Sequence, residues 1–225
     1  MKRTHRLLCA VIALVIVAGV LAWHLLPERP RSVPPSQTVP VVETDLDLLM
    51  LVNRNNPIPA GYEVELTQLS NGQSVASVIY PALQLMFDDA RAQGVYPIVA
   101  SGFRTAEKQQ SLMDEKIQGF LDEGYSEGEA IAEAALWVNA VGESEHQTGL
   151  AVDINADGVH SYGWEVYQWL EVNAWQYGFI LRYPEGKTNI TGTDYEPWHY
   201  RYVGPEAAKA IHRSGKCLEE YLGKA

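Results

Sequence analysis

The stretch "SEHQTGLAVDIN", Ser144 to Asn155, places a histidine and an aspartate on either side of a turn and a short apolar run. Gly149 permits the turn, and "LAVDI" has the character of a buried strand. The segment can therefore fold back so that His146 and Asp153 approach one point. Two interpretations follow. The pair holds a metal ion, or it consists of an ordinary polar turn residue and an ordinary acid on a strand.

A catalytic zinc site has three protein ligands and one open position, so this pair needs a third ligand. His199 in "YEPWHYRYV" is the candidate, because neutral imidazole and carboxylate oxygen both suit Zn²⁺. The chain has only two cysteines, Cys9 and Cys217, which are not expected to meet, so neither a disulfide framework nor a thiolate site is predicted. His160 is left out of the site because it lies in a loop and has no partner at a telling spacing. His212 is left out because a solvated helix face explains its position.

Glu196 lies three residues before His199. A carboxylate beside a metal-activated water can take its proton and later protonate a leaving amine. In a regular strand the two side chains would face opposite sides, because the period is two. A catalytic role for Glu196 therefore requires a bend near Pro197. From spacing alone, this role and that of an acid at a strand edge beside a core histidine are equally supported.

Arg104 in "SGFRT" follows a predicted strand and precedes a predicted helix. A loop arginine there can bind a carboxylate through two parallel hydrogen bonds, and a surface salt bridge is the simpler alternative. Gln109 and Ser144 are ordinary hydrogen-bonding residues by themselves. The aromatic residues Trp164, Tyr167 and Trp175 fall near helical spacing, which is typical of a core face.

Turn and cap signals divide the domain into short strands and helices. Asn71-Gly72 predicts a β-hairpin, and "YPIVASGF", "LAVDI", "FILRY" and "WHYRYV" read as strands. Helices are predicted from Pro81 to Gln93, from Thr105 to about Glu123, from Ser126 to about Ala140, from Ser161 to Tyr177 and from Pro205 to Arg213. The elements mix without a regular βαβ alternation. This order indicates an α+β fold with a mainly antiparallel sheet flanked by helices.

The N-terminal residues differ from the rest of the chain. Residues 1–6 form a basic tail that we expect in the cytoplasm, and residues 7–26 are an apolar run without formal charge, long enough to cross a bilayer. We expect an uncleaved membrane anchor, although "VLA" ending at Ala22 would also suit a signal peptidase and a secreted product. Residues 27–44 form a proline-rich linker, and residues 45–225 the folded domain outside the membrane.

The charge of the chain is uneven. Its formal net charge is −11, and because residues 1–31 carry +4, the remainder carries −15. A domain this acidic is a poor ligand for nucleic acid, and we expect no such partner.

Four segments in this order resemble the VanY-type D-alanyl-D-alanine carboxypeptidases, a group related to VanX-type dipeptidases, L,D-carboxypeptidases and hedgehog-like zinc domains. They are "LVNRNNPIP", "SGFRTAEKQQ", "SEHQTGLAVDI" and "YEPWHYRYVG", and they span about Leu51 to Gly204. The resemblance implies a zinc ion held by His146, Asp153 and His199, with Glu196 as the general base. It also implies that Arg104, Gln109 and Ser144 contact the substrate, and that the fold is a hedgehog-like zinc fold.

The implied activity is removal of the C-terminal D-Ala from peptidoglycan stem peptides by a monomeric zinc carboxypeptidase, with a link to glycopeptide resistance. An L,D-carboxypeptidase that cuts stem tetrapeptides would use the same metal and base. A zinc-stabilised cell-wall binding domain without catalysis is the third reading, and Glu196 argues against it, because a structural zinc site needs no base.

Overall fold

The computed structural model describes residues 31–225. The chain divides into residues Met1–Arg31 and a compact unit from Ser32 to Ala225, and the description below concerns this second unit. The predicted cytoplasmic tail and anchor, residues 1–26, lie outside the described residues. Within residues 31–225 no helix combines the length and the apolar character needed to cross a bilayer.

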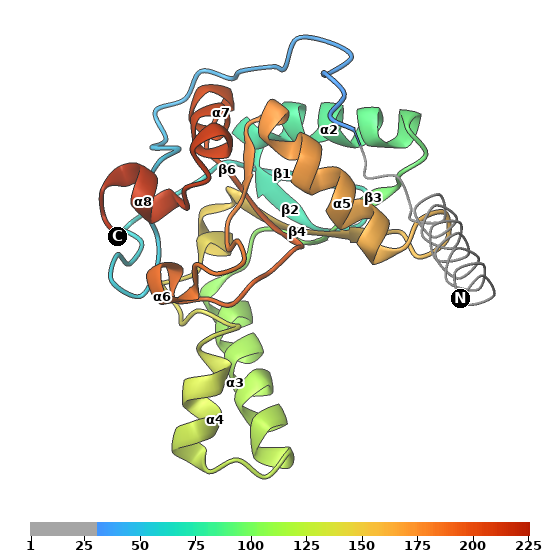
Figure 1. Ribbon diagram of the computed structural model, residues 1–225. Helices are drawn as coiled ribbons and strands as arrows, with labels where there is room; N and C mark the ends of the chain where they lie inside the picture. Colours follow the sequence, from blue (N-terminus) through green and yellow to red (C-terminus); the bar gives the residue numbers. More distant parts are fainter. Residues whose placement is uncertain (1–30) are drawn as a thin grey trace, which may run out of the picture. The chain divides into compact units, whose positions relative to one another are not determined.

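A four-stranded antiparallel sheet forms the centre of the unit (Figure 1). Its order is β3 (Pro97–Ser101), β4 (Ala151–Ala156), β6 (His199–Tyr202) and β5 (Phe179–Leu181). The predicted hairpin is confirmed as a separate two-stranded sheet, β1 (Leu66–Gln68) and β2 (Ser74–Ala76), joined through Asn71 and Gly72. The expected α+β class with an antiparallel sheet is therefore confirmed.

The two faces of the sheet have different functions, because successive side chains of a strand point to opposite sides. Val152 and Ile154 on β4 and Tyr200 and Tyr202 on β6 enter the main hydrophobic core. That core lies against α2 (Tyr80–Ala92), α5 (Gly163–Asn173) and the 3₁₀ turns η1 (Ser77–Ile79) and η3 (Ala174–Tyr177). The alternate residues of β4 and β6 face the other side. Among them are Asp153 and His199.

A second, smaller apolar cluster joins β5 to the C-terminal helices α7 (Pro205–Ser214) and α8 (Leu218–Leu222). The cluster includes Leu51, Ile180, Ile211 and Leu218. It brings the C-terminal helices and the segment around Leu51 to the sheet. The C-terminal helices and the segment around Leu51 therefore pack beside β5.

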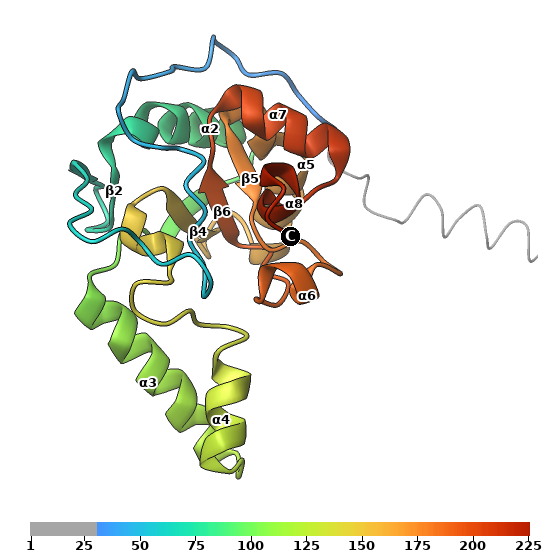
Figure 2. The same cartoon turned by 90° about the vertical axis from the view of Figure 1, so that its left-hand side faces the viewer.

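A helical hairpin extends away from the sheet, as both ribbon views show (Figures 1 and 2). It consists of α3 (Ala106–Asp122), whose first turn is capped by the Thr105 side chain, and α4 (Glu127–Ala134), which begins with the predicted Ser126–Glu129 capping box. The prediction that this second helix reaches Ala140 is wrong. The chain leaves the helix because the carbonyls of Leu136 and Asn139 accept hydrogen bonds from Asp194 and Gln109.

The remaining boundaries agree with the sequence except in detail. The helix predicted to start at Ser161 begins at Gly163 and changes to 3₁₀ geometry at Ala174, and a short helix, α6 (Thr188–Thr191), was not predicted. Trp164 is 53% exposed, so its assignment to a core face is wrong. Trp169 occupies the core instead, at 3% exposure.

Residues 31–44 contain neither helix nor strand. The segment is nevertheless held to the domain, because the backbone N–H of Val33 donates to Asn173 Oδ1 and that of Ser36 donates to Asp89 Oδ2. Val39 packs against the main core.

Candidate metal centre and substrate pocket

Strand register places the first two predicted ligands side by side. Asp153 on β4 and His199 on β6 are directly opposite partners in the antiparallel ladder. Both point to the face of the sheet that lies away from the main core. The distance from His199 Nδ1 to Asp153 Oδ1 is 3.1 Å. Two segments forty-six residues apart in the chain thus meet through one cross-strand pair.

The third predicted ligand, His146, comes from the 3₁₀ helix η2 (Glu145–Thr148), which ends at Gly149 with a φ of +72°. This left-handed residue is the turn that the sequence predicts before β4. The His146 Nδ1 atom lies 2.8 Å from the carbonyl oxygen of Gly102. A carbonyl only accepts, so Nδ1 carries the proton and Nε2 is left with a free lone pair. Nε2 is the atom that faces Asp153 Oδ1, at 3.3 Å.

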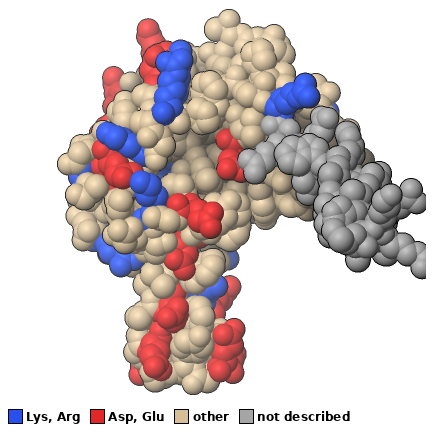
Figure 3. All heavy atoms as spheres, viewed as in Figure 1, with Lys and Arg blue, Asp and Glu red and all other residues tan. Residues whose placement is uncertain are grey.

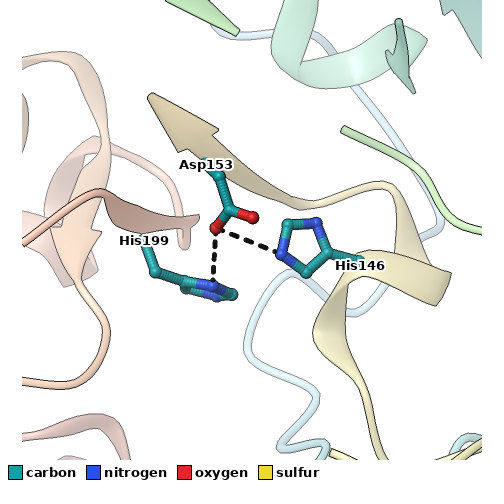
Figure 4. A group of neighbouring side chains, drawn as sticks. All are labelled: His146, Asp153 and His199. Carbon is teal, nitrogen blue, oxygen red and sulfur yellow. Dashed lines mark ion pairs between the residues drawn. The ribbon is translucent and has the colours of Figure 1, made fainter. Parts of the chain in front are cut away.

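Both imidazoles therefore converge on one carboxylate oxygen (Figure 4). The ligand atoms of His146, Asp153 and His199 all lie within 4.8 Å of one another. Donors bound to one tetrahedral zinc at about 2.0–2.1 Å are roughly 3.3 Å apart, and the distances of the two imidazoles from Asp153 Oδ1, 3.1 and 3.3 Å, fit such an ion. Within residues 31–225, no hydrogen bond of normal geometry reaches the buried Asp153 Oδ1. The donor set and this oxygen suit a metal cation.

The charge state of Asp153 agrees with this role. Burial acts to raise its pKa, but His146 and His199 outweigh burial and hold the pKa of Asp153 far below its usual range. Burial is also the main cause that lowers the pKa of His146, which favours the neutral imidazole that a metal requires.

Gly102 connects the metal centre to the β1–β2 hairpin. A Cβ atom at this position would lie 2.1 Å from the backbone oxygen of Ser74 on β2, so only glycine fits. The same loop is held by a hydrogen bond from the Phe103 backbone N–H to Ser74 O, 2.6 Å long. The hairpin therefore positions the carbonyl that orients His146.

The chain bends before β6 in the way that a catalytic Glu196 requires. The backbone N–H of His199 donates to the carbonyl of Glu196 at 3.1 Å, which closes a four-residue turn with Pro197 at its second position. The strand starts only at His199, so the alternation of a strand does not apply to Glu196. Its Oε2 atom lies 3.5 Å from His199 Nδ1. Glu196 and His199 thus face the same centre.

In the metal-free site, burial raises the pKa of Glu196 to about 7, and the nearby charge of Asp153 adds to this effect, while His199 and Arg104 oppose it. A carboxyl group with a pKa near neutrality can both accept and return a proton. Glu196 therefore lies beside the candidate metal ligands, at the position that the predicted general base requires.

The other ring nitrogen of His199 faces a carboxylate that the sequence did not single out. Glu145 Oε2 lies 3.9 Å from His199 Nε2, and its side chain is fully buried. The carboxylate is balanced by Arg182 at 2.7 Å and Arg201 at 3.0 Å. Burial acts to raise the pKa of Glu145, but the two arginines hold it far below its usual range. Glu145 therefore stays charged behind His199.

Glu219 on α8 completes this buried charge cluster of Glu145, Arg182, Arg201 and Glu219, and pairs with Arg182 at 2.7 Å. In the metal-free site, burial acts to lower the pKa of His199, but the nearby carboxylates of Asp153 and Glu145 outweigh burial and raise the pKa to about 9. A signal for the cluster was present in the sequence. Arg182 and Arg201 interrupt the apolar strands "FILRY" and "HYRYV", where a charge needs a buried partner.

A cavity of about 210 Å³ opens onto the metal centre. Its lining combines the three candidate ligands and Glu196 with polar, aliphatic and aromatic side chains from the helical hairpin and the loops: Arg104, Leu112, Lys116, Trp137, Val138, Asn139, Ser144, Tyr183 and Trp198. The sequence did not point to Lys116, Trp137 or Tyr183. They come from distant positions in the chain and carry no motif.

Arg104 reaches into this cavity and is held by three neighbours. Its Nε donates to Ser101, Nη1 to Gln109 and Nη2 to Asp153 Oδ2, the last at 2.6 Å. A guanidinium has five donors, so one hydrogen remains on each terminal nitrogen. These two are the donors that a two-point contact with a carboxylate needs.

The other two predicted substrate residues differ in position. Ser144 lines the cavity at 2% exposure. Gln109 is completely buried behind Arg104 and also donates to the carbonyl of Asn139 at 2.6 Å. Gln109 thus reaches the cavity through Arg104.

The two histidines left out of the site lie elsewhere. His212 stacks on Trp175 with ring centroids 4.6 Å apart. His160 does have a partner, contrary to the sequence reading, because its Nδ1 lies 2.6 Å from Asp157 Oδ2 in an exposed loop. Neither lines the cavity at the metal centre.

Three converging ligands, a buried carboxylate with a raised pKa and an arginine that can bind a carboxylate define the class of metal-dependent hydrolases. Residues 72–205 match the family model described as VanY, D-alanyl-D-alanine carboxypeptidase. The chain belongs to the VanY family of D-alanyl-D-alanine carboxypeptidases.

Curated and solved relatives agree with this membership. A D-alanyl-D-alanine carboxypeptidase of Enterococcus faecalis is 63% identical over 77% of this chain and 65% of its own length. The match thus spans slightly less than two thirds of that relative. A crystal structure of a variant of the vancomycin resistance D,D-pentapeptidase VanY with Zn(II) has 63% identity and a TM-score of 0.77, and the match covers 77% of this chain and 98% of that one. The LdcB LD-carboxypeptidase is 32% identical with a TM-score of 0.64 over 87% of this chain and 99% of that one.

Proposed function

We propose that this protein is a zinc-dependent D,D-carboxypeptidase that removes the C-terminal D-Ala from peptidoglycan stem peptides. The observation that carries the proposal is the geometry of one cavity. It joins a three-ligand metal centre, a buried carboxylate with a pKa of about 7 and an arginine with two free donors. The vancomycin resistance D,D-pentapeptidase with bound Zn(II) supports the metal and a role in glycopeptide resistance.

His146 Nε2, Asp153 Oδ1 and His199 Nδ1 are the atoms that would hold zinc. A zinc ion at this position supplies Lewis-acid activation of a water molecule and of the scissile carbonyl. Glu196 accepts the proton of the attacking water and passes it to the amine of the leaving D-amino acid.

Arg104 selects a terminal residue. Its two remaining donors would bind the free carboxylate at the end of the peptide. A fixed carboxylate places the last peptide bond near Glu196 and the metal ligands, which line the same cavity. This arrangement supports a carboxypeptidase over an endopeptidase.

A second candidate is an L,D-carboxypeptidase that acts on stem tetrapeptides. The 32% identity to the LdcB LD-carboxypeptidase favours it, and the same metal, base and arginine would serve it. A zinc-stabilised cell-wall binding domain without catalysis is less well supported, because a structural site needs no buried carboxyl group with a raised pKa beside its ligands.

We further infer that residues 7–26 anchor the protein in the membrane, with the catalytic domain outside the cell and the chain acting as a monomer. The apolar run without formal charge and its basic flank support this placement. Secretion after signal cleavage is the alternative. Fractionation and N-terminal sequencing of the protein from cells separate the two, because cleavage would release a shortened soluble form.

The activity is tested by mass spectrometry of pentapeptide and tetrapeptide stems after incubation with the zinc-loaded protein. We expect loss of one D-Ala from the pentapeptide and no loss after chelation. Cleavage of the tetrapeptide alone would favour the L,D-activity, and bound zinc without cleavage of any stem would favour the binding domain.

Glu196→Gln is the matched variant. It should keep zinc, because Glu196 is not one of the three ligands, and should lower kcat by about 10²- to 10⁴-fold. Near-normal turnover in this variant would refute the role of Glu196 as the base.

A further inference from the structure

Lys116 is an isolated cation in an acidic part of the chain. No other Lys or Arg occurs between Lys108 and Arg182. The hairpin of α3 and α4 that carries Lys116 is rich in Asp and Glu, and red side chains dominate it on the face shown in Figure 3. Lys116 nevertheless lines the cavity of the metal centre.

The helix α3 leads from the arginine site to Lys116. Gln109, which holds Arg104, and Leu112 and Lys116, which line the cavity, are spaced three and four residues apart and so share one face of the helix. Seven residues of α-helix span roughly 10 Å. The Cα atom of Lys116 therefore lies about that far along α3 from the Cα atom of Gln109, towards the tip of the hairpin.

Aromatic rings hold the ammonium group in place. Lys116 Nζ lies 4.9 Å from the centroid of the Trp137 ring and 5.4 Å from that of Phe120. Within residues 31–225, no carboxylate forms an ion pair with it at 4.0 Å or less. The ring contacts fix the position of the charge and leave its hydrogen-bond donors available.

The length of an extended peptide can be compared with the position of Lys116 on α3. An extended chain advances at most about 3.3–3.6 Å per residue, so roughly 10 Å corresponds to about three residues. On this backbone scale, a peptide whose terminal carboxylate lies at Arg104 extends about two to four residues before it reaches the level of Lys116.

We propose that Lys116, held against Trp137, forms an outer subsite that binds a carboxylate of the peptide upstream of the scissile bond. The inference rests on the proposed carboxypeptidase function and adds a second point of charge recognition to it. Two groups could supply the carboxylate. One is the free α-carboxylate of a D-glutamyl residue linked through its side chain, and the other is the side-chain carboxylate of a diamino diacid at the next position.

Matched peptides that end in D-Ala-D-Ala test the subsite on the full zinc-loaded chain. One pair carries the D-glutamyl α-carboxylate either free or as an amide, with lysine at the third position. A second pair carries the diamino diacid with its side-chain carboxylate free or amidated, and an amide at the second position. Diacetyl-Lys-D-Ala-D-Ala lacks both carboxylates and is the reference substrate.

The wild-type protein should prefer the free carboxylate over the amide in one pair, by roughly 3- to 10-fold in kcat/KM. Lys116→Met should remove this preference, Lys116→Arg should keep it, and Lys116→Glu should reverse it. The ratio within a pair cancels any effect of Lys116 on Glu196, and the reference substrate measures that effect directly. High salt should reduce the preference, because the group is only partly buried.

Lys108→Met is the control, since Lys108 is an exposed lysine on the same helix and outside the cavity lining. It should leave the preference unchanged. Equal rates within both pairs for the wild type, or a preference that survives Lys116→Met, would overturn the subsite while leaving the carboxypeptidase function intact. Failure of the wild type to cut any of the peptides, including the reference, would overturn both.

Discussion

Replacing Glu145 by glutamine tests whether the buried charge cluster supports the metal centre. The substitution keeps the size of the side chain and removes one charge from a fully buried position. Arg182 would still pair with Glu219, at 2.7 and 2.9 Å. Arg201 would lose its carboxylate and keep only backbone carbonyls, those of Leu48, Met50 and Tyr202.

An uncompensated buried charge costs about 3–5 kcal/mol, so Glu145→Gln should destabilise the metal-free domain by this amount. For a domain of this size, the melting temperature should fall by roughly 6–20 °C. The glutamine also weakens the partner of His199 Nε2. Loss of such an outer contact lowers metal affinity about 10- to 100-fold.

Thermal unfolding of the chelator-treated protein measures the first effect, and competition with a zinc chelator measures the second. Glu143→Gln makes the same chemical change two residues earlier at a partly exposed site, and should alter neither quantity. A wild-type melting temperature together with wild-type zinc affinity in Glu145→Gln would show that the reasoning from the buried cluster is incorrect.

Three further predictions concern the arginine, the glycine and the pH dependence. Arg104→Ala should lower kcat/KM for peptides with a free C-terminal carboxylate roughly 10- to 150-fold, the value of a charge-assisted hydrogen bond, and should affect C-terminally amidated peptides far less. Equal losses on both would exclude the carboxylate contact. Gly102→Ala should destabilise the protein by about 1–3 kcal/mol or more and weaken zinc binding, because the new Cβ would lie 2.1 Å from Ser74 O and displace the carbonyl that orients His146. Gly119→Ala, which meets nothing within 4 Å, is its control in unfolding and zinc titrations, and equal behaviour of the two variants would contradict the packing argument. The pKa of His199 is about 9 in the metal-free site, so zinc must displace a proton at neutral pH. Zinc affinity should therefore rise with pH, by about tenfold per unit between pH 7 and 8, and level off above pH 9. Calorimetry in buffers of different ionisation enthalpy measures both the affinity and the proton released. A zinc affinity independent of pH would refute the protonated state of His199 in the metal-free site.

Much of the metal centre could be predicted because its residues lie in short local patterns. Ser144, His146, Gly149 and Asp153 belong to one turn and strand, and the local geometry of that segment is set by its own residues. Residue type and spacing made His199 and Glu196 candidates, and the resemblance to a known family assigned their roles as ligand and base. The helical hairpin was predicted with a second helix that is too long, because its end is decided by Asn139 and Leu136, whose partners lie on other segments.

The roles of Glu145 and Lys116 could not be predicted in the same way. Glu145 acts through Arg182 and Arg201, whose side chains meet only after three separate segments have folded together. Lys116 depends on the position of Trp137 beside α3. Neither residue has a periodic or local signature, since tertiary contacts have no fixed spacing in the sequence.

The sequence by itself determined the fold class, the strands that carry the ligands and the left-handed turn at Gly149, because these follow from periodicity and backbone preference. Only the tertiary structure decided which side chains face one another. Antiparallel register sets Asp153 opposite His199, and the turn at Pro197, closed by a hydrogen bond from His199 to Glu196, brings the acid to the same side. The spacing left that question open, because a regular strand would have separated the two residues. The turn resolves it by starting the strand at His199.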